Sequence, residues 1–215
     1  ESRRRLEVKY RQFVHAGANL SDADKAKLRQ INRHDASLET EFQQRLIAGS
    51  KAAAFVTADK ADLAGLSDAE IDAAAKAAQD RNLPGQYLIP QQNTTQQPVL
   101  AELTNRAVRE KIYDNSITRN EKGDGNDTRA IIRQLAQLRA EKARLLGYPN
   151  YAAYVLYDQM AQTPEAVESF INKLVPATAA RIADESRQIQ AMIDRSGPHF
   201  DLQPWDWEMY SDKVR

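Results

Sequence analysis

Apolar residues recur at intervals of three and four along most of this chain, which is the spacing of amphipathic helices. The first such stretch, residues 1–16, carries Leu6, Tyr10, Phe13 and Val14 on one face. The same spacing predicts further helices over about 21–48, 67–80 and 127–146, one from Pro98 with a break near Asn105, one through Tyr151–Tyr157, and one from Pro164 towards Gly197. The chain is therefore expected to be mainly α-helical.

Residues typical of helix ends support these boundaries. Ser21 is a suitable N-cap, and Ser67 with Glu70 three residues later forms a capping-box pattern. Thr163-Pro164 marks another helix start, while Gly147 is expected to end a helix. Pro176 should kink or break the last long helix, because proline lacks the backbone donor that the helix needs.

Two short segments have a different pattern. Residues 54–57 and 86–90 are β-favouring and bounded by turn-forming residues, so we expect them to pair as a small two-stranded appendage. The predicted fold class is a mainly α multi-helix array with this β appendage. We assign 1–215 to a single helical fragment, with 50–90 as a small β/helix insertion and 98–215 as the helical body.

Composition removes several classes of function. Lysine plus arginine number 30, and aspartate plus glutamate also number 30. This balance argues against a nucleic-acid partner and against a polybasic membrane-surface role, since both require a positive field. The absence of cysteine excludes disulfides and a thiol nucleophile, and it fits a cytoplasmic location.

The chain starts at Glu1-Ser2-Arg3 without an initiator methionine and stops at Lys213-Val214-Arg215 without a closing signal. Both ends favour the interpretation that the sequence is a piece of a longer protein. The alternative is a natural short form of the protein that ends at this point.

Candidate metal chemistry is sparse. The three histidines are His15, His34 and His199, and none has a second histidine four residues away, as the zinc motif H-E-x-x-H requires. His34-Asp35 interrupts an apolar face and is interpreted as a polar notch. We therefore predict no catalytic, cofactor-binding or metal-ligating residue in this chain.

Two other features were open to a ligand interpretation. The Asp/Asn/Gly-rich loop 119–128 resembles a calcium loop in composition, but its spacing does not match an EF-hand, and we expect a turn in which Asn126 or Asp127 caps the next helix. The tyrosines Tyr148, Tyr151, Tyr154 and Tyr157 could face a ligand, although packing is the commoner role of aromatics at helical spacing.

Three stretches resemble the thimet oligopeptidase family of zinc peptidases, most closely its bacterial peptidyl-dipeptidase members. These stretches are the loop 119–129, the segment 145–165 with Leu-Leu-Gly-Tyr-Pro-Asn-Tyr, and Leu202-Gln203-Pro204-Trp205-Asp206-Trp207. The resemblance implies a larger, two-lobed helical enzyme whose zinc is held by the histidines of H-E-x-x-H and a later glutamate. That motif lies downstream of the tryptophan-rich stretch, so no family metal or catalytic residue maps onto this chain.

The resemblance thus implies a non-catalytic helical portion of a zinc-dependent oligopeptidase that hydrolyses short peptides, releasing C-terminal dipeptides. This portion alone is expected to be inactive and to bind no zinc. Because it lacks the rest of such an enzyme, we expect exposed apolar surface and self-association. A non-enzymatic helical protein-interaction module is the competing interpretation.

Overall fold

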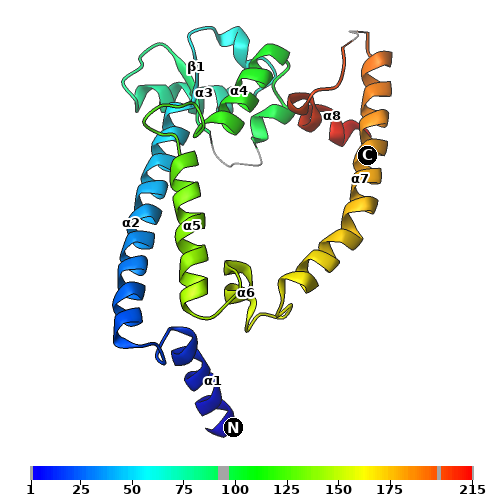
Figure 1. Ribbon diagram of the computed structural model, residues 1–215. Coiled ribbons are helices and arrows are strands. Elements are labelled where there is room, and N and C mark those ends of the chain that lie inside the picture. Colours follow the sequence, from blue (N-terminus) through cyan, green and yellow to red (C-terminus); the bar gives the residue numbers. More distant parts are fainter. Residues whose placement is uncertain (1, 92–96, 198–199, 215) are drawn as a thin grey trace. The chain divides into compact units, whose positions relative to one another are not determined.

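The computed structural model describes residues 2–91, 97–197 and 200–214, and they form a mainly helical structure (Figure 1). The elements are α1 (Ser2–His15), α2 (Asp22–Ala52), β1 (Phe55–Thr57), the 3-10 turn η1 (Lys60–Leu63), α3 (Asp68–Gln79), β2 (Tyr87–Ile89), η2 (Pro98–Ala101), α4 (Arg106–Thr118), α5 (Arg129–Leu145), α6 (Tyr151–Leu156), α7 (Pro164–Arg195), η3 (Pro204–Asp206) and α8 (Trp207–Val214). The predicted fold class is confirmed.

Most predicted boundaries are confirmed by the hydrogen bonds at the helix ends. Ser21 caps α2 by accepting from the backbone N–H of Asp24 at 3.1 Å. Ser67 and Glu70 form the reciprocal capping box at the start of α3, and the Ser67 hydroxyl, followed by its backbone N–H, lowers the pKa of Glu70. β1 and β2 pair antiparallel with Val56 opposite Leu88, as the two β-favouring segments predict.

The structure corrects three local predictions, wholly or in part. Helix α2 continues to Ala52 rather than ending near Ala48. Pro98 begins a 3-10 turn and not an α-helix, although the predicted break near Asn105 is confirmed, since Asn105 caps the start of α4. Helix α7 runs from Pro164 to Arg195 with Pro176 inside it, so the break offered as one of the two outcomes at Pro176 does not occur, because loss of one backbone donor can be accommodated within a long helix.

Most of the Gln/Thr/Asn stretch 91–97 lies outside the described residues, as does His199. Packing within the described chain divides into two compact units. The first consists of the chain up to Gln44 together with Thr128–Leu174, and the second consists of Arg45–Asp127 and the chain from Val175 onward. None of the described helices is both long enough and apolar enough to cross a membrane.

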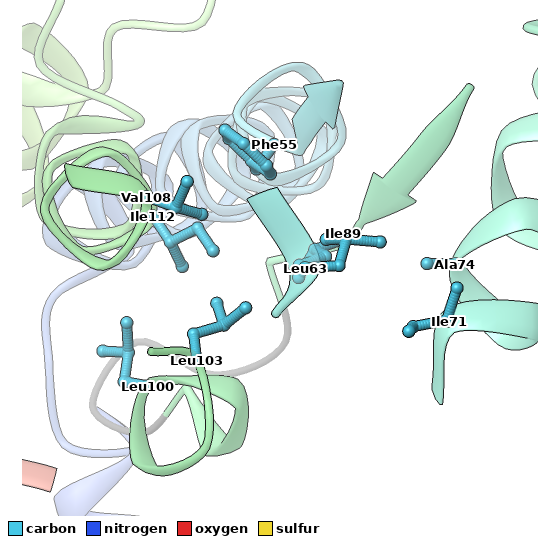
Figure 2. Packing of buried hydrophobic residues seen from close by; sticks show 9 residues of the cluster. All are labelled: Phe55, Leu63, Ile71, Ala74, Ile89, Leu100, Leu103, Val108 and Ile112. Carbon is cyan, nitrogen blue, oxygen red and sulfur yellow. The ribbon is translucent and has the colours of Figure 1, made fainter. Parts of the chain in front are cut away.

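The second unit contains the larger apolar core, which joins the β appendage to α3, η2 and α4 (Figure 2). Leu63, Leu103 and Ile112 have no exposed surface. The core residues are Phe55, Leu63, Ile71, Ala74, Ile89, Leu100, Leu103, Val108 and Ile112. The residues between Phe55 and Ile89 are therefore packed into the body of this unit and do not hang freely from it.

A buried ion network holds the C-terminal segment on α4. The carboxylate of Asp206 is fully buried and accepts from Arg109 Nη2 at 2.7 Å and Arg106 Nη2 at 2.9 Å. The backbone N–H of Gln203 also donates to it at 3.1 Å. The tryptophan-rich segment is thereby packed on α4.

The remaining donors of the buried Arg109 are also satisfied. Its guanidinium donates to the carbonyls of Leu103, at 2.8 Å, and Trp205, at 3.2 Å. The Arg106 guanidinium carbon lies 4.2 Å from the centre of the Phe200 ring, a cation–π distance. A buried charge pair is tolerable only when its hydrogen bonds are complete, and here they are.

The loop 119–128 is fastened to the end of α2. Asn120 donates to the carbonyls of Arg45, at 2.9 Å, and Asn126, at 2.8 Å. This brings its side chain against Gly49, where an added Cβ would lie 2.9 Å from Asn120 Cγ. The close approach explains a glycine near the end of a long helix.

In the first unit, α2 and α5 run side by side (Figure 1) around a small core. Leu38, Ile131 and Leu135 are buried there, and Phe42 and Leu138 pack against them. Helix α1 differs, since none of its residues from Ser2 to His15 is buried. Its apolar face is formed but left in solvent, with Leu6 71% and Phe13 67% exposed.

We predict that Asp206→Asn lowers the free energy of unfolding by roughly 3–5 kcal/mol, because it leaves the buried Arg109 without its counter-charge. Urea denaturation of the 215-residue chain measures this change. The control is Asp201→Asn, at an exposed position whose backbone carbonyl, rather than its carboxylate, accepts from Arg106. Equal losses of unfolding free energy in the two variants would contradict the proposed contribution of the buried ion network to stability.

Gly49→Ala is expected to destabilise the chain by about 1–3 kcal/mol through overpacking against Asn120. The sign is diagnostic, because Gly→Ala in an ordinary helix stabilises by roughly 0.5–1 kcal/mol. Gly125→Ala is the matched control, since a Cβ there meets nothing within 4 Å. A stabilised Gly49→Ala variant in the same urea titration would refute the close-packing explanation.

Candidate functional site

The two histidines that the structure describes do not form a metal site. His15 ends α1 and is half-buried, whereas His34 is exposed on α2. Over residues 2–91, 97–197 and 200–214, no three side chains of His, Cys, Asp or Glu are arranged to hold a metal ion. The zinc that the family resemblance implies therefore finds no matching donor set among the described residues, and no catalytic step is derived through it.

The polar notch at His34-Asp35 has a structural use. Asp35 accepts from Arg139 Nε of α5 at 3.2 Å, and Glu39 accepts from Arg139 Nη2 at 2.5 Å. Burial, the largest single influence, would lower the pKa of Arg139, but the charge and hydrogen bond of Asp35 together with Tyr151 and Glu39 outweigh it, and the pKa is raised. The His–Asp pair is thus split, with only the aspartate tied to the neighbouring helix.

An open groove of about 960 Å³ lies along α2 and α5 within the first unit. Its floor is apolar, formed by Phe42, Leu135 and the half-exposed Ile132, and its polar side carries Arg139 with Glu39. The other lining residues are Ala36, Thr40, Gln43, Ala136 and Tyr151. This lining offers contact surface but lacks the histidine, cysteine or lysine that would act as a base or nucleophile.

The tyrosines of 148–157 pack around His15. The imidazole lies 3.7 Å from the ring centre of Tyr157 and 4.1 Å from that of Tyr154, nearly parallel to both. Two rings this close cannot share one face, so they lie on opposite faces of the imidazole. At its edge, Nδ1 is 2.9 Å from the Tyr148 hydroxyl. The packing interpretation of Tyr148, Tyr154 and Tyr157 is confirmed.

The same cluster shifts the titration of its members. Burial lowers the pKa of His15, with Asp158 opposing and Lys142 adding to the effect. Burial also raises the pKa of Tyr154, helped by the neighbouring tyrosines, and that of Tyr157, helped by Asp158. All three shifts favour uncharged rings, which is the effect expected of partial burial.

Sequence patterns could not reveal this cluster, because His15 and Tyr148 are 133 positions apart. The available signal was the unusual density of tyrosine after Gly147. It indicated aromatic packing but did not identify His15 as the partner.

The Asp/Asn/Gly loop is a turn, but its predicted capping role was wrong. Asp127 Oδ2 accepts from the backbone N–H of Gly123 at 2.8 Å, and Asp124 accepts from that of Asn126 at 2.8 Å. Helix α5 instead begins after Thr128, and neither Asn126 nor Asp127 caps it. The Asp127 carboxylate closes the loop on Gly123, and the backbone of Asn126 bonds to Asp124 and Asn120.

Comparison with known families and proteins identifies the class. The model of peptidase family M3 matches residues 99–215, more than half of the chain. The chain belongs to peptidase family M3, as the resemblance predicts.

Individual proteins similar to this chain also carry the names of peptidases. The chain is 51% identical over all 215 residues to a dipeptidyl carboxypeptidase of Escherichia coli, and 46% identical to one of Salmonella typhimurium. It is 26% identical over 214 residues, 98% of its length, to oligopeptidase A of Haemophilus influenzae. The chain spans only 32%, 32% and 31% of these proteins, about a third of each.

Proposed function

We propose that this chain is a non-catalytic helical portion of a zinc-dependent dipeptidyl carboxypeptidase that hydrolyses short peptides. The supporting observation is its 51% identity along its whole length to a protein named for that activity. The described residues offer no metal-binding group, so the zinc and the groups that activate water would come from other parts of such an enzyme. A cytoplasmic location, which the absence of cysteine favours, belongs to the same proposal.

Within such an enzyme these helices would act as scaffold and as part of one wall of the peptide channel. The buried Asp206–Arg109 pair and the α2–α5 core are suited to holding helices in fixed positions, which catalytic geometry requires. The domain assignment also stays a proposal: 98–215 as the body that continues into the catalytic part, with 50–90 as an insertion. The family match beginning at residue 99 supports it.

A non-enzymatic interaction module is the second candidate, favoured by exposed apolar side chains on α7. Five of them between residues 170 and 182 are about half exposed or more: Phe170, Ile171, Leu174, Val175 and Ile182. Surface of this kind usually marks a place where protein packs. In our primary proposal it packs against the remaining polypeptide of the peptidase, and in the second it binds a separate protein.

A chimera tests the primary proposal. This chain replaces the 215-residue segment that it matches in the Escherichia coli dipeptidyl carboxypeptidase. Release of dipeptides from a blocked short peptide in the presence of zinc should stay within about tenfold of the parent, since the catalytic groups remain and the scaffold is conserved in type. The corresponding deletion should be inactive.

The isolated 215-residue chain is the second arm of that experiment. It should show no turnover with added zinc, and equilibrium dialysis should find no stoichiometric zinc. Zinc-dependent cleavage by this chain would overturn its non-catalytic role. A chimera that unfolds cooperatively yet lacks activity would show that this chain cannot replace the matching segment of the Escherichia coli enzyme. That result would favour the second candidate, a non-enzymatic interaction module.

The isolated chain is also predicted to self-associate, because apolar side chains on α1 and α7 have no cover within it. Light scattering should show an apparent mass that rises with concentration. Phe170→Lys combined with Leu174→Lys should reduce the association, whereas Lys173→Arg, a change on the same helix that keeps the charge, should not. A monomer at all concentrations would contradict this prediction.

A further inference from the structure

Helix α1 is attached in an unusual way. None of its residues is buried, and its apolar stripe, with Leu6 71% and Tyr10 63% exposed, is not packed against the first unit. The attachment is at its C-terminal end, where His15 enters the tyrosine cluster. Since His15 carries the closest aromatic contacts of this helix, a change in that side chain would weaken the attachment.

The turn after His15 is the point about which α1 would move if it were released. Gly17 has φ +95, a backbone conformation that favours glycine. A Cβ at this position would lie 2.8 Å from Leu28 Cδ2 and 3.0 Å from Leu20 Cδ1. The turn is therefore packed on α2, while the part of α1 before His15 has no comparable burial.

Protonation would change two of the contacts that His15 makes. If Nε2 carries the hydrogen of the neutral ring, Nδ1 can accept from the Tyr148 hydroxyl. A protonated Nδ1 must donate instead, so this hydrogen bond has to reverse. The cation would also lose water between the rings of Tyr154 and Tyr157, a loss that cation–π attraction only partly offsets.

Charged groups around the cluster come from every element near it. Lys142 of α5 opposes a positive imidazole, whereas Asp158, just after α6, favours it. Arg11 of α1 acts on the neighbouring Tyr157. From α2, Lys25 and Arg29 line the hollow beside Phe13 and Gly17. Of the charges that act on His15 itself, Asp158 raises its pKa more than Lys142 lowers it, so burial, and not charge, favours the neutral ring.

We propose that His15 is a pH-sensitive latch, which holds α1 on the Tyr148–Tyr157 segment when its imidazole is neutral and releases it when the ring is protonated. The direction of the lowered His15 pKa agrees, since burial is its largest cause. The docked state binds the proton more weakly than the released state. Docking is thus fully present above the ordinary value of 6.5 and is lost as the pH falls below it.

A distance measurement tests the latch. The chain has no cysteine, so Arg4→Cys and Arg144→Cys provide two exposed labelling points, one on α1 and one on α5. Time-resolved energy transfer between dyes on them should show a narrow distance distribution near pH 8 and a broader one near pH 5. Each unit by which the His15 pKa is lowered weakens docking by at most about tenfold.

Three variants make the result specific. His15→Phe keeps an aromatic ring without a titrating nitrogen, and should stay docked across the pH range. His15→Gln removes the ring, and should be released at every pH. His34→Gln, at the exposed histidine of α2, should behave like the parent.

Histidine resonances in NMR spectra of the same chain give the midpoint of the His15 titration, which should lie below 6.5 and coincide with the change in distance. The proposal is overturned if the distance distribution of the parent does not change with pH. It is equally overturned if His15→Phe responds like the parent, or if His15 titrates at or above its ordinary value.

Discussion

The second unit depends on the full pairing of one buried carboxylate. Asp206 has no exposed surface, and two arginines and a backbone N–H surround it. It joins the C-terminal segment to α4, some hundred residues earlier in the chain. Because an unpaired charge in that position would be costly, the network admits very little variation in how the tail can dock. The apolar core of this unit also stabilises the fold, but it fixes the position of the C-terminal segment less closely, because apolar contacts are not directional.

The first unit is built differently. Its core holds three buried residues, and the pairing of α2 with α5 is reinforced by Arg139 bridging Asp35 and Glu39. Helix α1 adds no buried residue and is attached through an aromatic cluster at its end. A thin core with much exposed apolar surface is what one expects of helices that pack in a larger protein, which agrees with relatives about three times as long.

Membership of a peptidase family and absence of a peptidase site among the described residues are compatible. Catalysis needs groups held in fixed positions, and much of the polypeptide of an enzyme serves that purpose without touching substrate. The motifs that carry the family resemblance have structural roles in this chain. Asn120 fastens a loop, Tyr148 and Tyr154 pack on His15, and Asp206 anchors the tail.

The sequence by itself determined the helical class, the β pair, most helix ends and the family, because periodicity and caps act through residues close in the chain. It also showed that no histidine pair stands at zinc-motif spacing. Only the tertiary structure decided that Asp206 meets Arg109 and that His15 lies between Tyr154 and Tyr157. It also showed that the apolar stripe of α1 stays in solvent, although its spacing equals that of a buried helix. The physical reason is that folding brings together side chains a hundred positions apart. A local sequence pattern does not identify the distant residue that a given side chain will contact.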